Sequence, residues 1–271
     1  MDILWVIDDT SSMRDEQAAL QDAFADFATG LEALDLSWQV GFITTDISDA
    51  NAGTLLGDPW ILTPDLDDPV AAITAAATVG TDGEAPEAGL GAAFLALSEP
   101  LLSTSNRAFR RDDAALHVIV VSDADDSSDT VLGEDPVDAF TAFLTAEAER
   151  SGQDARLSAV VGDVPSGCTW DGGAALPGER YADVALATGG VVASICSRDL
   201  SPVTASLADL SVSWPTSFPL QAVPDPDTVL VWIDDVRQAD GYSVELSPPA
   251  LVFATPPEGG AEIRVSYEVA Q

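Results

Sequence analysis

Strands that alternate with helices over the first two hundred residues predict an α/β fold, a doubly wound and mainly parallel sheet with helices on both faces. The strands are continuous apolar runs such as ILWVI and LHVIVV, which is typical of strands buried on both faces. Apolar residues at three- and four-residue steps between these runs are typical of amphipathic helices. Toward the carboxyl terminus, short alternating strands with turns rich in Pro, Asp and Gly predict a small antiparallel β module.

The elements follow from these patterns in chain order. The predicted strands are residues 3–7, 38–45, 116–121, 157–161 and 191–195, and the predicted helices are 17–34, 69–78, 87–102, 136–150, 180–187 and 202–210. Residues 47–68 form a loop whose length is typical of a functional segment. The pattern changes near Ser213, so we expect one domain at residues 1–212 and a β module, acting as a spacer or packing module, at residues 213–271.

Composition excludes several classes of partner. The chain has 271 residues, 46% of them hydrophobic, which suffices for the core of one large domain with a small second one. Its 46 acidic residues against 10 basic ones, all arginines, give a net charge of -36, which repels nucleic acid and anionic membranes. No apolar run reaches the roughly 18 residues of a membrane span, so we expect no direct membrane insertion. The charge suits salty or calcium-rich surroundings, or simply favours solubility.

The cysteines leave two interpretations open. Cys168 and Cys196 lack the spacing of a zinc site, and they could form one disulfide outside the cytoplasm or remain free buried thiols. The chain also opens directly in its first predicted strand. We therefore expect any leader or anchor to lie outside this sequence.

Oxygen-bearing side chains follow the first strand where it ends. Asp8, Thr10 and Ser12 alternate along this loop and offer one anionic and two neutral oxygens, the ligands that Mg²⁺ and Ca²⁺ prefer. The alternative is that the loop merely caps the following helix. Asp46 and Asp123 end two further strands. Because ligands of such sheets bind beyond the carboxyl ends of the strands, we expect these acids to gather at one edge.

Two motifs together resemble a known family. With Asp8-x-Thr10-x-Ser12-Met13 on a first strand and Ser122-Asp123 on a later one, residues 1–212 resemble a von Willebrand factor type A domain, a Rossmann-like fold with a metal-ion-dependent adhesion site. The resemblance implies a central Mg²⁺ or Mn²⁺ bound by the first motif, with Asp123 binding through water. Thr10 departs from the family's Ser but keeps the hydroxyl.

The second loop refines this resemblance. Family members most often place a Thr there, and Thr81 is nearby, but residues 82–87 (DGEAPE) more closely resemble the corresponding loop of the integrin β-subunit's inserted A domain. That comparison implies that Glu87 binds the central metal, with Thr81 as the fallback. The integrin specificity loop has cysteines that this chain lacks after Asp46.

The integrin comparison also implies flanking Ca²⁺ sites on both sides of the central ion. One would use Asp15, Glu16 and Asp123, and the other Asp46, Asp82, Glu84 and Glu87 with the Pro86 carbonyl. Two alternatives remain open. Asp15 and Glu16 could simply favour the amino end of a helix, and the other acids could belong to the ordinary loops of an acidic chain.

The function implied is a metal-dependent, adhesion-type module of a bacterial-type secreted or surface protein, which captures an acidic side chain of a protein partner outside the cell. The alternative is a structural subunit of an extracellular assembly stabilised by Ca²⁺ or Mg²⁺, with self-assembly in place of a separate ligand. We expect no enzyme, because the chain has one histidine and no phosphate-cradling motif. We interpret His117 as structural, and Asp125, Asp126 and Asp129 as a solvated acidic loop.

Overall fold

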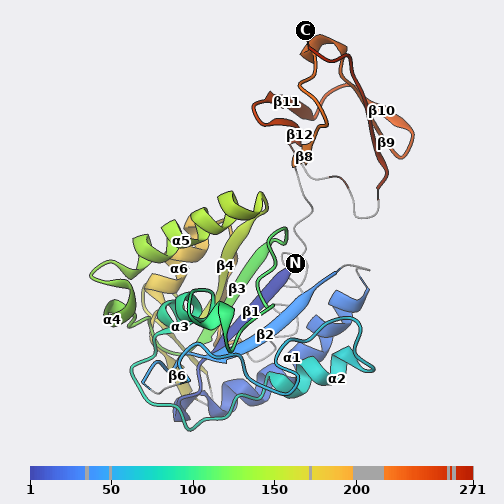
Figure 1. Ribbon diagram of the computed structural model, residues 1–271. Coiled ribbons are helices and arrows are strands. Elements are labelled where there is room, and N and C mark those ends of the chain that lie inside the picture. Colours follow the sequence, from blue (N-terminus) through green and yellow to red (C-terminus); the bar gives the residue numbers. More distant parts are fainter. Residues whose placement is uncertain are drawn as a thin grey trace. The chain divides into compact units, whose positions relative to one another are not determined.

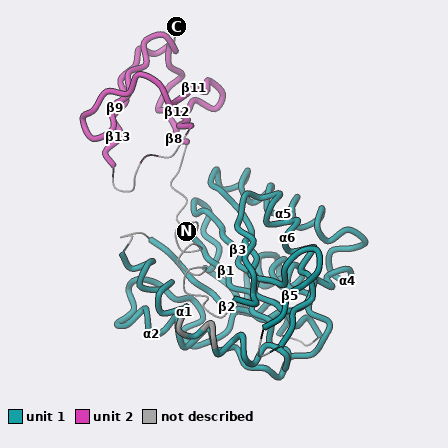
Figure 2. Tube along the Cα trace, turned by 180° about the vertical axis from the view of Figure 1, so that it is seen from behind, with its two compact units in different colours: residues 1–212 teal, residues 213–271 magenta. Residues whose placement is uncertain are grey.

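The protein divides into two compact units, Met1–Val212 and Ser213–Gln271 (Figure 2). The computed structural model describes residues 1–33, 37–48, 51–170, 173–197, 217–254, 257 and 261–270. The helix predicted at residues 202–210 lies outside the described residues. Within those residues no helix is both long and apolar enough to cross a bilayer.

A five-stranded parallel sheet forms the centre of the first unit. Its strands are β1 (Asp2–Ile7), β2 (Gln39–Thr44), β3 (Leu116–Ser122), β4 (Ala155–Val161) and β7 (Val192–Ser194), and their order in the sheet is β2-β1-β3-β4-β7. Every pairing within it is parallel. The chain therefore leaves β1 toward one end of the sheet and β3 toward the other, which makes the carboxyl ends of β1 and β3 a topological switch point.

Helices cover both faces of this sheet, so the predicted α/β fold class is confirmed. They are α1 (Arg14–Glu32), α2 (Pro69–Ala76), α3 (Gly89–Ala96), α4 (Asp129–Leu132), α5 (Pro136–Ser151) and α6 (Glu179–Ala187). Figure 1 shows α1 and α2 on one side of the sheet and α3, α5 and α6 on the other.

The alternation of side chains along β1 explains the two layers. Ile3, Trp5 and Ile7 pack into the core beneath α1 and α2. Leu4 and Val6 pack into the second core with α3, α5 and α6. Because successive residues of a strand point to opposite faces, a strand with two covered faces must be apolar throughout.

The helix predicted at residues 87–102 is too long. The structure has α3 only at Gly89–Ala96, with Leu97 as its C-cap, followed by a short 3-10 helix at Leu101–Ser103. Pro100 accounts for the break, because proline lacks an N–H group and clashes with the preceding helical turn. The short α4 and the hairpin of β5 (Cys168–Trp170) and β6 (Gly173–Ala175) were not predicted.

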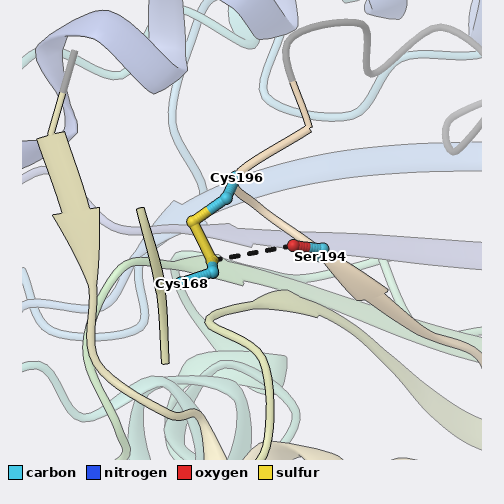
Figure 3. Close-up of a disulfide and its surroundings, with 3 residues drawn as sticks. All are labelled: Cys168, Ser194 and Cys196. Carbon is cyan, nitrogen blue, oxygen red and sulfur yellow. Dashed lines mark hydrogen bonds between the residues drawn. A yellow bond between two sulfur atoms is a disulfide. The ribbon is translucent and has the colours of Figure 1, made fainter. Parts of the chain in front are cut away.

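A disulfide joins Cys168 to Cys196 and ties this hairpin to the edge of the sheet (Figure 3). Cys168 lies in β5, and Cys196 follows β7 by two residues. The hydroxyl of Ser194, the last residue of β7, lies 3.6 Å from the Cys168 sulfur. The bridge holds the hairpin close to the end of β3, where Leu176 N–H donates to the Asp123 carbonyl at 2.8 Å.

Ion pairs tie the sheet to α5 at the amino end of β1, which is the end of the strand away from Asp8. Asp2 is fully buried, and its carboxylate lies 3.0 Å from a terminal nitrogen of Arg110 and 2.7 Å from the Arg111 guanidinium. Arg110 also binds Glu147 of α5 at 2.8 Å. This arrangement links a strand, a loop and a helix that are distant in sequence.

The second unit contains two three-stranded antiparallel sheets. Their strands are β8 (Ser217–Pro219), β9 (Leu230–Ile233), β10 (Val236–Gln238), β11 (Tyr242–Leu246), β12 (Pro249–Phe253) and β13 (Ile263–Ser266), with a 3-10 helix at Pro226–Thr228. Val229, Val231, Leu251 and Phe253 form its buried core. The predicted fold class of this module, small and antiparallel β, is confirmed.

Candidate metal centre

The candidate site begins where β1 and β3 end. Because β1 pairs with β3 in register, with Ile7 opposite Val121, Asp8 follows one strand beside Ser122 of the other. The Asp8 backbone N–H donates to the Val121 carbonyl at 2.9 Å. Asp8 and Asp123 are therefore brought to the same edge by strand pairing alone, as the sequence predicts.

The carboxylate of Asp8 is fully buried and is held by hydroxyl groups. Its Oδ1 accepts hydrogen bonds from the Thr10 N–H at 2.9 Å and the Thr10 hydroxyl at 2.6 Å. Its Oδ2 accepts from the Ser122 hydroxyl at 2.6 Å. The Thr10 and Ser12 hydroxyl oxygens lie 3.1 Å apart. A hydroxyl that donates to Asp8 keeps its lone pairs for a cation, so the first motif forms a cluster of oxygen donors.

Glu87 belongs to the same cluster. Its loop is anchored to the ends of two strands, because Ala88 N–H donates to the Thr45 carbonyl at 3.1 Å and Ser127 N–H donates to the Glu87 carbonyl at 2.8 Å. Burial raises the pKa of Glu87, and the charges of Asp8 and Asp123 raise it further, while a hydrogen bond from the Thr10 side chain opposes the shift.

Asp123 completes this cluster. Its side chain is buried, and burial raises its pKa, which the charge of Asp8 also raises and a hydrogen bond with Ser12 lowers. Carboxylates that repel one another in a partly buried site gain most from a cation placed among them. The predicted central set of Asp8, Thr10, Ser12, Glu87 and Asp123 is thus drawn together from three separate loops.

Glu16 has the most exceptional environment near this cluster. It is only 4% exposed, and neither carboxylate oxygen has a hydrogen-bond partner among the described residues. Burial raises its pKa, followed by the charges of Asp123, Asp15 and Asp8. Its predicted companion Asp15 is exposed. A buried carboxylate without a partner is costly unless a cation or proton neutralises it, so Glu16 fits a ligand role better than a helix-end role.

The second flanking site differs from its prediction. A polar cavity of about 200 Å³ lies beside Asp46, and its lining includes Asp9, Thr44, Asn51 and Thr54 but not Asp82 or Glu84. Asp46 Oδ2 accepts a hydrogen bond from the Glu84 backbone N–H at 3.2 Å, whereas the Asp82 and Glu84 side chains are exposed.

The remaining predicted ligands of this second loop lie apart from the cluster. Pro86 is exposed, and Thr81 makes no hydrogen bond to the cluster within the described part of the chain. The motif gives the order of the residues, but side-chain direction depends on packing, which the motif does not specify.

Asp9 is a site residue that the sequence reasoning missed. Its Oδ1 is buried and has no hydrogen-bond partner in the described part of the chain, and its pKa is raised to about 6 by burial first and then by the charges of Asp46 and Asp8. Its backbone carbonyl accepts from Gly83 N–H at 2.8 Å, and a Cβ on Gly83 would meet the Asp9 carboxylate. Any larger residue at position 83 would therefore require the Asp9 side chain to move. The adjacent acids in DD of the first motif were the available signal.

The donor set fits a hard divalent cation at the central position. Carboxylate and hydroxyl oxygens are the ligands of Mg²⁺, Mn²⁺ and Ca²⁺. Acidic side chains alone do not make the site: in the described ranges no three Asp, Glu, His or Cys side chains form a metal-binding group. The Thr10 and Ser12 hydroxyls are therefore essential to the fit.

Two other predictions concern residues outside the cluster. His117 is buried, and its Nε2 lies 2.8 Å from the Ser158 hydroxyl, as a structural residue would. The expectation of a solvated acidic loop is wrong for Asp126, which is 4% exposed and accepts hydrogen bonds from α3 and Ser128. Asp129 does face solvent, where it pairs with Arg180 at 2.7 Å.

Comparisons with known proteins find similar solved structures at low sequence identity. No protein-family model matches the chain, and no curated protein matches it. Among solved structures, the chain is similar to a von Willebrand factor type A protein from Catenulispora acidiphila (13% identity, TM-score 0.45, 99% of this chain). It is also similar to proximal thread matrix protein 1 from the mussel byssus, solved with a zinc-occupied MIDAS motif (15%, 0.47, 78%), and to the pilus adhesin SpaC from Lactobacillus rhamnosus GG (14%, 0.44, 98%). The chain spans 58%, 45% and 39% of these three proteins, respectively.

Proposed function

We propose that the first unit is a von Willebrand factor type A domain whose metal-ion-dependent adhesion site binds Mg²⁺ or Mn²⁺ and captures a carboxylate of a protein partner. The observation that carries the proposal is the meeting of Asp8, the Thr10 and Ser12 hydroxyls, Glu87 and Asp123 at the switch point of the sheet. Open α/β sheets bind ligands at this position.

The chain's charge supports this mechanism. A protein of net charge -36 repels an acidic partner unless a cation supplies a local positive field. When bound, the cation would act as that field and leave a coordination position for the partner's oxygen. The protein's own residues orient the site, because Ser122 and Thr10 hold the Asp8 carboxylate in one direction.

Flanking Ca²⁺ ions complete the proposal. Glu16 would bind one of them together with water, and the cavity lined by Asp9 and Asp46 would hold the other. The Cys168–Cys196 bridge supports a location outside the cytoplasm, where disulfides persist. The chain's one histidine lies buried in β3 and is not one of the site residues, so a Ser-His-Asp mechanism has no support and we propose a binding protein and not an enzyme.

Mn²⁺ binding tests the central site. We expect Asp8→Ala to abolish Mn²⁺ binding measured by calorimetry and by water-proton relaxation, with the circular dichroism spectrum unchanged. The control is Asp67→Ala, which removes an exposed acid from a distant loop and should leave the affinity within twofold. Equal Mn²⁺ affinity in wild type and Asp8→Ala would contradict the proposed site.

The capture of a partner's carboxylate by the bound ion is tested separately from the binding of the ion itself. A peptide with one aspartate should displace water from bound Mn²⁺ and lower the relaxation enhancement, whereas the same peptide with asparagine should not. Absence of any difference between the two peptides would favour a structural role for the ion.

A further inference from the structure

The amino end of α3 obtains its hydrogen-bond partners from elsewhere in the fold. The first N–H groups of an α-helix have no partner within the helix, and the N-cap here is Ala88, whose side chain cannot accept a hydrogen bond. Gly89 N–H donates instead to the Tyr181 hydroxyl of α6 at 3.0 Å. Leu90 N–H donates to Asp126 Oδ1 at 3.0 Å.

Ser128 supplies the next acceptor, and it is joined to Asp126. Gly91 N–H donates to the Ser128 hydroxyl at 2.7 Å, and that hydroxyl donates to Asp126 Oδ1 at 2.6 Å. Asp126 Oδ2 accepts from the Ser128 N–H at 3.0 Å. The Asp126 side chain has no exposed surface, so these donors stabilise its buried carboxylate.

The same contacts hold the loop of Glu87 against the loop that follows β3. Ser127 N–H donates to the Glu87 carbonyl at 2.8 Å, two residues before the α3 contacts begin. The approach is close: a Cβ on Gly89 would lie 2.8 Å from the Tyr181 hydroxyl oxygen. Glu87 therefore directly precedes a segment whose successive backbone N–H groups, from Gly89 to Gly91, are hydrogen-bonded to other elements.

We propose that Asp126, Ser128 and Tyr181 are positioning residues, which set the place of the Glu87 carboxylate relative to Asp8 and Asp123. This inference rests on the proposed function, because it takes Glu87 as a metal ligand. The three residues act through the α3 backbone. Outer partners that orient ligands commonly change metal affinity by 10- to 100-fold when they are replaced.

A double-mutant cycle distinguishes positioning from general stabilisation. We expect Asp126→Asn to weaken Mn²⁺ affinity by about 10-fold or more in an otherwise wild-type chain. In a chain that already carries Glu87→Gln, the same change should alter the affinity by less than about twofold, because its target is gone. Equal losses in both backgrounds would overturn the proposal.

The chain offers a matched control and a milder variant. Asp129→Asn removes the same charge at the start of α4, where the carboxylate pairs with Arg180 and not with the α3 backbone. Arg180 also donates to the Asp126 carbonyl at 3.0 Å, a contact that does not involve the Asp126 carboxylate, so the Mn²⁺ affinity should stay near that of the wild type. If Asp126→Asn fails to fold, Tyr181→Phe keeps the ring and removes one acceptor, and it should show the same dependence on Glu87 with a smaller loss. A Tyr181→Phe loss that persists with Glu87→Gln would also overturn the proposal.

A metal-free measurement separates this inference from the proposed function. Wild-type protein that binds no Mn²⁺ would contradict the proposed function. In that case hydrogen exchange of the Leu90 amide, followed by NMR without metal, decides whether Asp126 holds the loop. Faster exchange in Asp126→Asn than in Asp129→Asn supports that contact, and equal exchange contradicts it.

Discussion

Glu16 shows most clearly what single residues reveal about this protein. Folding has placed its carboxylate, 4% exposed and without a hydrogen-bond partner among the described residues, beside the predicted central site. A buried polar group without a partner costs about 1–3 kcal/mol, and more when it is charged. Such a residue is a poor choice for stability, which is consistent with a ligand role.

Replacing Glu16 by glutamine should stabilise the metal-free protein at pH 7.5 by about 1 kcal/mol, because an unpartnered buried amide costs less than an unpartnered buried carboxylate. The folded-state pKa of Glu16 is raised, so its penalty grows as pH rises above the ordinary value and is complete where the folded carboxyl is ionised. The penalty should shrink as pH falls through the raised pKa and vanish below the ordinary value of 4.5. Urea unfolding in EDTA at several pH values measures this difference.

The control for this prediction is Asp15→Asn, which changes the adjacent exposed acid and should alter stability by less than about 0.5 kcal/mol. Added Ca²⁺ should reverse the ranking, since glutamine is the weaker ligand. A wild-type protein more stable than Glu16→Gln in EDTA at neutral pH would show that the carboxylate has a favourable partner.

At the scale of elements, the two ends of the parallel strands differ in their side chains. The carboxyl ends of the strands gather the oxygen donors of the site, whereas the amino end of β1 has the buried ion pairs of Asp2, Arg110 and Glu147. Arg110, with a side chain 2% exposed, also donates to the Arg111 and Ala114 carbonyls at 2.7 Å. This network holds β1 to the loop before β3 and to α5, and thereby fixes the strands whose other ends form the site.

Arg110→Met should destabilise the protein by about 1.5–3 kcal/mol, the range for hydrogen bonds to charged groups. Asp2 and Glu147 lose their shared buried cation, while Asp2 keeps Arg111 and Glu147 keeps Arg150. Arg150→Ala is the matched control: Arg150 also binds Glu147, at 2.8 Å, but is 38% exposed, and its loss should cost about 1 kcal/mol or less. Urea unfolding curves compare the two. Similar losses for both would mean that burial does not govern this network.

The charge of the whole molecule separates general from specific ion effects. At a net charge of -36, NaCl should raise the melting temperature of the metal-free protein by screening repulsion. MgCl₂ at equal ionic strength should raise it further, since an ion at 100 times its Kd adds about 2.7 kcal/mol. Asp8→Ala should lose that increment and keep the NaCl response. Equal melting temperatures in the two salts would contradict a specific site.

The sequence determined the order of strands and helices, because hydrophobic periodicity is local and shows which faces are buried. It also placed Asp8, Thr10, Ser12 and Asp123 at strand ends, which parallel pairing must bring to one edge. Pro100 was a readable signal that α3 would end early, whereas composition and spacing could not show that Asp126 would be buried.

Only the tertiary structure decided which acids share a cavity. Asp9 lines the cavity beside Asp46. Asp82 and Glu84, which the motif groups with Asp46, are exposed instead. Asp126 holds Leu90 across 36 residues of sequence. Side-chain direction and burial depend on contacts between segments far apart in the chain, and these contacts form only when the layers pack together. The residue types of the site are thus readable in the sequence, but their grouping is a property of the packed fold.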